Sequence, residues 1–344
     1  MQVFKEISTL LLEQKPFVCY VKPNESVWNL LLQQNDEWVE FTHQAGFVFI
    51  PFQEGKQVVI PFEGNLFLQG NFENQIKKTA ESFTAESNQK QSFENLVTNG
   101  VAAIQSGEFD KVVLSRKIVL KEQIAIVASF ENIIATYSTA FRYLFFHPKV
   151  GLWMGATPEQ LVKINQNQFE TVALAGTQLF AEKVIWESKE IEEQQFVTDY
   201  IVANIKNKVN QLIVTDANTV KAGNLVHLKS FISGELTADF QAIDLIKTLH
   251  PTPAVCGLPK ENAIDFILKN EGYNRKYYAG FLGEYNNDKQ TDLFVNLRCL
   301  EVEEDVVNIY VGCGITKDSN PEKEFIETEN KSMTMRNVLV SKTF

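Results

Sequence analysis

Hydrophobic positions at the start of the chain recur at helical spacing and then change to short apolar runs. Val3, Phe4, Ile7 and Leu10 fall on one face of a helix, and charged residues within this segment distinguish it from a signal peptide. The apolar runs that follow are separated by turn residues. This pattern predicts a meander of mostly antiparallel strands at residues 17–21, 38–41, 47–52 and 58–62.

The rest of the chain alternates groups of predicted helices with groups of predicted strands. A helical pattern over 72–108 contains a polar stretch at 86–92, the one plausible internal boundary, which we expect to be an exposed connection. Further strands are predicted at 111–120, 143–146, 150–155, 169–174, 278–285, 292–302 and 306–312. Further helices are predicted at 130–137, 188–209, 240–249, 261–269 and 321–340. Because strands and helices come in groups, the pattern favours an α+β architecture over a doubly wound parallel sheet.

The composition is that of an ordinary globular protein with an acid excess. Of 344 residues, 44% are hydrophobic, which is enough for a large core. The net charge of -11 and the absence of any Lys/Arg-rich block argue against nucleic acid and anionic membranes as partners. No apolar run reaches the roughly 18 residues of a membrane span, and the four cysteines form no CxxC pair. We therefore expect a cytoplasmic monomer with reduced thiols.

Two predicted helices place glutamates on the same stripe as apolar residues. Glu190 and Glu193 begin one stripe and Glu324 and Glu327 the other, each at offsets of 0 and 3 followed by face residues at 7 and 11. An ionised carboxylate is costly to bury without a cation, and Mg²⁺ prefers carboxylate oxygens with water and substrate oxygens. The same spacing is common on a solvated face, so both interpretations stay open at this point.

Two strand ends supply further candidates. In the segment GATPE, Thr157 can cap and Pro158 can begin a helical turn, so Glu159 is expected near a helix start. There it could be a catalytic carboxylate or could compensate the helix dipole. In the segment ALAGT, Gly176 and Thr177 could bind an anion through backbone N–H groups or could simply form a turn.

Three titratable residues lie in predicted strands. Lys111 opens its strand, and taken alone such a lysine is expected to be exposed. Arg298 lies inside the apolar run 293–300, where an arginine usually holds an anion. His227 is expected, from its apolar neighbours, to be a buried histidine with satisfied hydrogen bonds.

Several ordered segments resemble the chorismate-binding enzyme family, which includes isochorismate synthases, salicylate synthases, anthranilate synthase component I and aminodeoxychorismate synthase component I. Between residues 109 and 331 the matching segments are FDKVVLSR, GATPEQLV, ALAGT, SKEIEEQQFV, HPTPAVCGLP, YYAGFLGEYN, LFVNLRCLEV, YVGCGI and SNPEKEFIETENK. The resemblance implies the family's α+β fold, in which two β-sheets pack face to face with helices outside and the site between them. It also implies one chorismate-utilising domain over 1–344, with a variable part at 1–90 and the core at 91–344.

The resemblance implies Mg²⁺ as the cofactor. Glu193 and Glu327 match the family's main metal ligands, and Glu190 and Glu324 match supporting carboxylates. One departure lies next to a ligand position, because Gln194 stands where relatives usually have His.

The resemblance also assigns catalytic and substrate-binding positions. Lys111 matches the family's water-activating base and Glu159 its general acid. The positions that line the substrate match Gly176, Thr177, His227, Tyr278, Arg298, Gly312 and Lys331. Residues 178–180 lack the arginine often found after the AGT segment. Because chorismate is a dicarboxylate and the protein is acidic, Mg²⁺ and Arg298 are each expected to neutralise one carboxylate.

Three positions distinguish the branches of the family. Lys111 is present, whereas the aminating branches lack it, and Ala175 stands where aminodeoxychorismate synthases carry a nucleophilic lysine. Ala254, a further position expected near the substrate, stands where salicylate synthases typically show Thr. We therefore expect an isochorismate synthase of menaquinone or siderophore biosynthesis, with salicylate synthase as the alternative. A catalytically idle chorismate-binding partner subunit is the alternative from another class, and the retained Lys111 and Glu159 argue against it.

Overall fold

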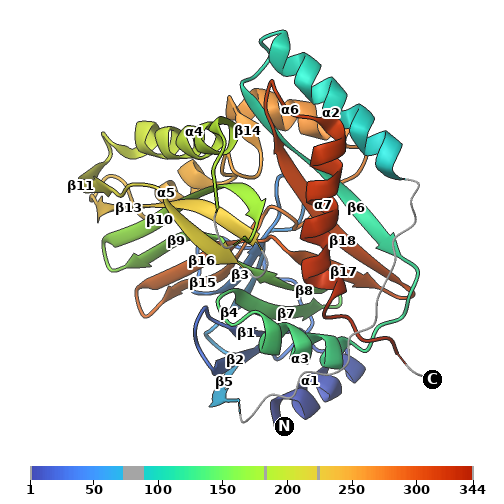
Figure 1. Ribbon diagram of the computed structural model, residues 1–344. Coiled ribbons are helices and arrows are strands. Elements are labelled where there is room, and N and C mark those ends of the chain that lie inside the picture. The colour runs from blue at the N-terminus through green and yellow to red at the C-terminus, as the bar shows by residue number, and fades with distance from the viewer. Residues whose placement is uncertain (1, 73–88, 182–183, 223–224, 343–344) are drawn as a thin grey trace.

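Two large antiparallel β-sheets pack against each other and helices cover their outer sides, as the computed structural model shows (Figure 1). The structure describes residues 2–72, 89–181, 184–222 and 225–342. The predicted α+β architecture of two packed sheets flanked by helices is confirmed. Within the described residues, no helix has the length and apolar character that crossing a membrane requires.

Both sheets take strands from distant parts of the chain, and every strand pair in the described residues is antiparallel. The first sheet contains, in spatial order, β14 (Gly257–Leu258), β6 (Lys111–Leu120), β18 (Val306–Ile315), β17 (Cys299–Glu303), β8 (Gly151–Thr157), β7 (Phe141–His147), β1 (Phe17–Val21), β2 (Val27–Leu32) and β5 (Leu66–Asn71). The second contains β11 (Val209–Val214), β13 (Leu225–Leu236), β10 (Gln168–Leu179), β9 (Gln160–Asn165), β16 (Gln290–Val295), β15 (Phe281–Asn287), β3 (Gly46–Ile50) and β4 (Val58–Pro61), and β12 (Asn218–Ala222) also pairs with β13.

Alternation along the first sheet divides the hydrophobic core into two layers. In β1, Val18 and Tyr20 belong to the layer between the sheets, whereas Phe17, Cys19 and Val21 belong to the layer under the outer helices. Successive side chains of a strand lie on opposite faces, which gives this period of two. Because both faces are covered, the strand reads as a continuous apolar run.

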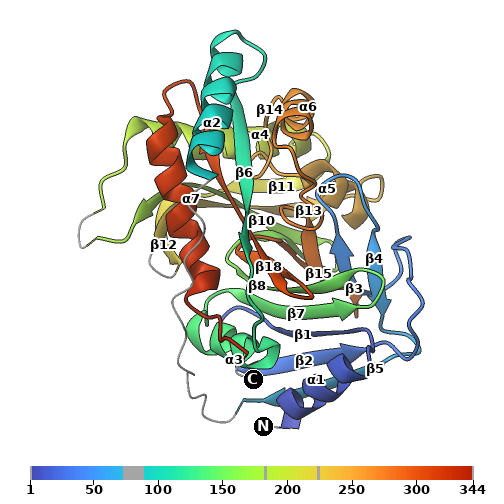
Figure 2. The same ribbon diagram turned by 90° about the vertical axis from the view of Figure 1, so that its right-hand side faces the viewer.

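The helices cover the outer faces of the sheets. They are α1 (Gln2–Leu12), α2 (Lys90–Gln105), α3 (Ile126–Thr136), α4 (Ser188–Ile205), α5 (Ala242–Leu249), α6 (Lys260–Asn270) and α7 (Pro321–Arg336). Helices α1 and α3 pack on the first sheet with the end of α7, and α4 packs on β10 and β13 of the second. Figure 2 shows α2 and α7 next to β6 and β18.

Two chain segments pass from one sheet to the other, side by side. Strand β8 of the first sheet continues into β9 of the second, and β16 of the second continues into β17 of the first. Val295 N–H donates to Glu159 O at 2.9 Å, and Ala156 N–H donates to Arg298 O at 3.0 Å. The crossings therefore hold Glu159 and Arg298 at neighbouring corners between the sheets.

These crossings correct two predictions from the sequence. The predicted strand 292–302 is two strands in different sheets, because the chain turns before Arg298, which has a left-handed φ of 48°. The helix start expected at Glu159 is wrong, since the chain continues as strand β9. The Thr157 hydroxyl still accepts a hydrogen bond from Glu159 N–H at 3.3 Å, so it stabilises the corner instead of a helix.

The prediction missed strands in both sheets, among them β9, β11, β12, β13 and β14 in the later part of the chain. The opening helix and strand 17–21 are confirmed, but β2 and β5 were not predicted. The predicted strand 38–41 is wrong, because only an isolated bridge forms there and the buried Gln33 amide donates to nearby carbonyl oxygens in place of a ladder. Most of the connection predicted at 86–92 lies outside the described residues, and its described end belongs to α2. The single-domain assignment stays a prediction.

Candidate active site

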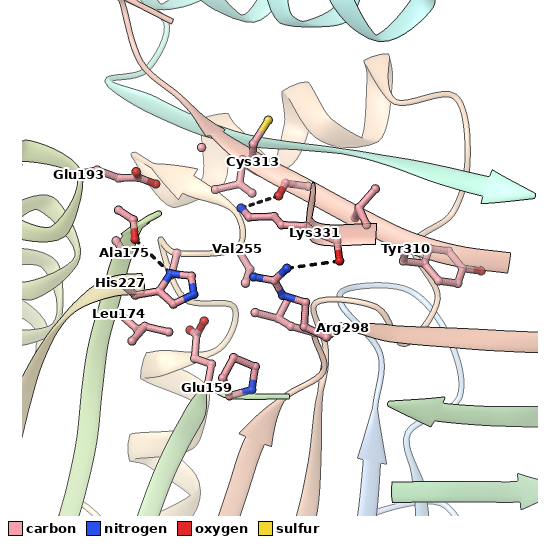
Figure 3. Close-up of a pocket in the computed structure, with 18 of the residues that line it drawn as sticks. Glu159, Leu174, Ala175, Glu193, His227, Val255, Arg298, Tyr310, Cys313 and Lys331 are labelled. Carbon is pink, nitrogen blue, oxygen red and sulfur yellow. Dashed lines mark hydrogen bonds between the residues drawn. The ribbon is translucent and has the colours of Figure 1, made fainter. Parts of the chain in front are cut away.

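The two corner residues line a cavity between the sheets. It has a volume of about 680 Å³, part of it open to solvent, and its walls come from both sheets, α4, α7 and the segment before β14 (Figure 3). Nine of the fourteen residues singled out from the sequence line it: Glu159, Gly176, Glu193, His227, Ala254, Tyr278, Arg298, Gly312 and Lys331. The fold thus gathers residues that are up to 172 positions apart in the chain.

Glu159 lies buried at one corner of the cavity, and its carboxyl points inward (Figure 3). Burial raises the pKa of Glu159 to about 7, while Lys111, Lys331 and Arg298 act in the opposite direction. A carboxyl with this pKa is partly protonated near neutral pH, so it can donate a proton.

Arg298 points into the same cavity from the second crossing (Figure 3). Burial lowers the pKa of Arg298 from its usual value, but an arginine in this range stays charged at neutral pH. Within the described part of the chain, its guanidinium makes one long hydrogen bond, 3.5 Å from Nη1 to Lys331 O. Most of its donors are therefore available for a carboxylate.

Lys111 and Glu193 form an ion pair on the α4 side of the cavity. Lys111 is fully buried at the start of β6, and its Nζ lies 3.0 Å from Glu193 Oε1. Gly314 of β18 makes room for this pair, since a Cβ there would lie 2.2 Å from Glu193 Oε1. The expectation that a lone Lys111 is exposed is wrong, because the carboxylate offsets the cost of burying the ammonium.

Lys331 and Glu327 form a second ion pair on the α7 side. Lys331 Nζ lies 2.6 Å from Glu327 Oε1 and donates to Gly312 O at 2.9 Å. Gly312 also allows Tyr278 to approach β18, since a Cβ at Gly312 would lie 2.9 Å from the Tyr278 hydroxyl. This side therefore presents an ammonium and a phenol to the cavity.

Gly176 and His227 form the wall from the second sheet. The pairing of β10 with β13 shifts register between Ala175 and Thr177, and Gly176 at the shift has a φ of 70°, which favours glycine. Its carbonyl lies 3.1 Å from His227 Nδ1. Because a carbonyl can only accept, Nδ1 carries the hydrogen and Nε2 has the lone pair. Burial lowers the pKa of His227 to about 3, so the ring is neutral.

The other predicted residues do not line the cavity wall. Glu190 accepts from Glu187 N–H at 3.0 Å in a capping box at the start of α4. Glu324 is buried in the first turn of α7. The backbone of Thr177 pairs with His227, and its side chain lies outside the described part of the structure. The roles assigned to these residues stay predictions.

The donor chemistry around the cavity fits Mg²⁺, although the protein ligands are few. Among the residues that the structure describes, no three His, Cys, Asp or Glu side chains gather closely enough to hold a metal ion. Mg²⁺ is often held by one or two carboxylates together with water and substrate oxygens. Glu193 on the wall and Glu327 beside Lys331 can supply such oxygens, and each is paired here with a lysine.

Sequence reasoning missed parts of the wall that follow directly from strand alternation. Gly314 stands two residues after Gly312 on β18, and Val113 stands two residues after Lys111 on β6. Residues two apart share a face of a strand, so both lie on the same side as the predicted residue. This period was the signal that could have found them.

Comparisons with known proteins give a consistent set of relatives. The family model described as chorismate binding enzyme matches residues 62–340. Isochorismate synthase DhbC of Bacillus subtilis (strain 168) is 29% identical over 312 residues, which cover 83% of this chain and 78% of that protein. Isochorismate synthase EntC of Escherichia coli (strain K12) is 27% identical over 259 residues, which cover 72% of this chain and 66% of that protein. The solved structure of MenF, the menaquinone-specific isochorismate synthase of Escherichia coli, has a TM-score of 0.80 and 20% identity over 94% of this chain and 88% of that one, which shows a shared fold.

Proposed function

The chain belongs to the chorismate-binding enzyme family, and we propose that it is an isochorismate synthase, an isomerase that converts chorismate to isochorismate. Relatives that carry this name support the proposal. The observation that carries it is that a buried lysine, Lys111, and a buried carboxyl, Glu159, belong to the same site. Lys111 is the first of the three cations that act on the Glu159 carboxyl.

The proposed reaction exchanges one hydroxyl position for another. Lys111, in its neutral form after the ammonium that pairs with Glu193 has lost a proton, takes a proton from the water that adds to C2 of chorismate. Glu159 gives its proton to the C4 hydroxyl as it leaves. The ring double bonds shift, one water enters and one water leaves, so no oxidant or reductant is needed. The raised pKa of Glu159 keeps a proton available for this step.

The two carboxylates of chorismate require positive charge from the site itself. Arg298 and Lys331 point into the cavity and supply two cations. The neutral His227 can accept a hydrogen bond from a substrate hydroxyl at Nε2. We propose that Mg²⁺, held by Glu193 and Glu327, supplies further positive charge at the ring carboxylate when it is bound.

Two alanines support this branch of the family over its neighbours. Ala175 leaves no amine on the β10 wall that could act as a nucleophile, and Ala254 offers no hydroxyl to orient the enolpyruvyl group for pyruvate loss. We therefore propose that the product is isochorismate and that it feeds menaquinone or siderophore biosynthesis. The net charge of -11 argues against a nucleic-acid partner, and we further propose that the protein is a cytoplasmic monomer.

Chromatography of a long incubation with chorismate and Mg²⁺ at neutral pH tests the function. We expect a plateau mixture of chorismate and isochorismate, because the exchange is nearly thermoneutral and reversible. Equimolar salicylate and pyruvate, above a control of isochorismate without protein, would establish the salicylate synthase instead. Binding of chorismate in calorimetry without any turnover would establish the idle partner subunit.

A further inference from the structure

Strand β6, which carries Lys111 at its start, has a neighbour on its outer side for only a few residues. Strand β14 stands at the edge of the first sheet and pairs with Lys111 and Val112. Val113 N–H still donates to Cys256 O at 2.8 Å. Beyond this point the described residues place no strand beside β6 on that side, although the backbone of Val113 and Ser115 is buried and needs hydrogen-bond partners.

Glu271 and Arg275 supply the hydrogen bonds that a neighbouring strand would otherwise make. Arg275 Nη2 donates to Val113 O at 2.7 Å, and Ser115 N–H donates to Glu271 Oε1 at 2.7 Å. Arg275 Nε also donates to Glu271 Oε2 at 2.8 Å, and the two side chains are 2% and 1% exposed. One buried ion pair thus replaces an acceptor and a donor of the missing strand.

The same guanidinium holds two further parts of the cavity wall. Arg275 Nη1 donates to Val255 O at 2.8 Å, and the guanidinium lies 5.9 Å from the Tyr278 ring centre. Val113, Val255 and Tyr278 all line the cavity. Arg275 therefore joins β6, the segment before β14 and the segment before β15 at one point behind the site.

A second buried arginine shows what a purely structural role looks like in this chain. Arg142 donates to the backbone carbonyls of Ala140, Ile134, Lys22 and Glu25. None of these four residues lines the cavity. Arg142 and Arg275 are thus equally buried and both donate to backbone carbonyls. They differ in that Arg275 also pairs with a carboxylate and that its carbonyl partners belong to residues of the cavity wall.

We propose that Glu271 and Arg275 are positioning residues for the reaction, and that their ion pair fixes the Lys111 strand relative to the neighbouring segment at Val255 and to Tyr278. This proposal rests on the proposed function. The planar fork of an arginine can donate to several acceptors at fixed angles, and a lysine cannot. A misplacement of reacting groups by about 1 Å can cost about 10²-fold in rate.

Steady-state kinetics of Arg275→Lys beside Arg142→Lys test the proposal. Arg275→Lys lowers kcat by about 10²-fold and changes the KM for chorismate by less than about threefold, because the substrate-facing cations remain. Arg142→Lys loses about as much in Tm as Arg275→Lys does, but its kcat stays within about twofold of wild type. Glu271→Gln retains an oxygen that can accept from Ser115 N–H, so its kcat lies between those of wild type and Glu271→Ala. Wild-type kcat in folded Arg275→Lys, or an equal kcat loss in Arg142→Lys, overturns the proposal.

Hydrogen exchange measured by mass spectrometry gives a readout that does not depend on activity. We expect peptides that cover residues 111–115 and 252–257 to exchange faster in Arg275→Lys and to be unchanged in Arg142→Lys. If wild-type protein makes no isochorismate, the proposed function fails, while this exchange pattern still decides whether the pair holds the two segments. Unchanged exchange in Arg275→Lys overturns the positioning role whatever the activity.

Discussion

The helices α4 and α7 carry the same spacing of glutamates, but their second glutamates lie in different surroundings. Glu193 on α4 pairs with Lys111, which comes from another element and is completely buried. Glu327 on α7 pairs with Lys331 one turn along the same helix, and the two side chains are 26% and 15% exposed. The α4 pair is thus a tertiary contact whose lysine is shielded from solvent, whereas the α7 pair is local and has both members partly exposed.

The first glutamates of the two helices differ in burial, and here the residue on α7 is the more buried one. Glu190 on α4 is partly exposed and caps its own helix, whereas Glu324 on α7 is buried. The same spacing in sequence therefore gives two partly exposed carboxylates on α4, whereas on α7 it gives one buried and one partly exposed carboxylate. What determines the chemistry is the element that faces each helix, and spacing alone does not contain that information.

Removing each lysine in turn should give the largest difference in kcat between the α4 side and the α7 side of the cavity. We expect Lys111→Ala to lower kcat by about 10²–10⁴-fold, because a general base contributes about that much. Lys331→Ala should mainly raise the KM for chorismate, because we assign that ammonium to substrate binding and not to proton transfer. Initial rates of isochorismate formation by chromatography, with circular dichroism as the folding control, measure both. Equal kcat losses in the two variants would show that Lys111 is no more than a substrate-binding cation.

Removing each carboxylate should separate the two ion pairs by stability. Glu193→Gln leaves the buried Lys111 without its counter-charge and should cost about 3–5 kcal/mol of unfolding free energy. Glu327→Gln removes a solvated pair and should cost less than about 1 kcal/mol. Urea unfolding at pH 7 without added metal measures the difference. Similar costs would mean that solvent reaches Lys111 when the pair is broken.

The sequence was sufficient for those parts of the fold that depend on local periodicity. Strand 111–120 and the helix 261–269 were placed within one residue of β6 and α6, because apolar period and turn residues are local signals. The sheet crossing before Arg298 was missed, because an apolar run looks the same whether it stays in one sheet or changes sheets. The β10 bulge at Gly176 was also not located. A Cβ at Gly176 would lie 3.0 Å from the Cβ of Glu190 on α4, and this contact between two elements leaves no signal in the strand pattern.

The candidate site was predicted mainly from the family resemblance, and the structure adds contacts that single residues cannot indicate. Lys111 alone was expected to be exposed, and only its partner on α4 explains why it is buried. Gln194, where the family usually has His, donates to the hydroxyls of Thr198 and Ser230 at 2.9 Å each, and so ties α4 to β13. Such a tether joins residues 36 positions apart, which no local pattern contains.

Glu159 lies under the influence of both lysines, and its pH dependence can compare them. Its pKa in the folded protein is about 7, above the 4.5 of a free carboxyl. Its contribution to stability is therefore fully present below pH 4.5 and is lost as the pH rises through 7. Glu159→Gln should reduce the loss of unfolding free energy between pH 5 and pH 8 by about 2–3 kcal/mol. Urea unfolding across this range measures it, and an unchanged slope would show that Glu159 is ionised throughout.

The same titration also shows which of the two lysines has the larger effect on the pKa of Glu159. Lys111 comes before Lys331 among the groups that lower the pKa of Glu159. Lys111→Met should therefore raise the pKa of Glu159 further than Lys331→Met does. The difference between each variant and its Glu159→Gln double variant measures this shift. A larger shift in Lys331→Met would reverse the ranking of the two cations.

The smallest expected effect comes from two glycines of β18, one beside each ion pair. A Cβ at Gly314 would lie 2.2 Å from Glu193 Oε1, so Gly314→Ala must displace that carboxylate. A Cβ at Gly312 would instead meet the backbone Leu114 O at 2.8 Å and the Tyr278 hydroxyl at 2.9 Å. If Glu193 holds Mg²⁺, Gly314→Ala should raise the Mg²⁺ concentration for half-maximal activity by about tenfold, while Gly312→Ala should mainly raise the KM for chorismate. Activity titrated with Mg²⁺ after EDTA treatment measures both variants. Equal Mg²⁺ requirements would remove Glu193 as the metal ligand of this wall, and full activity in excess EDTA would remove the metal altogether.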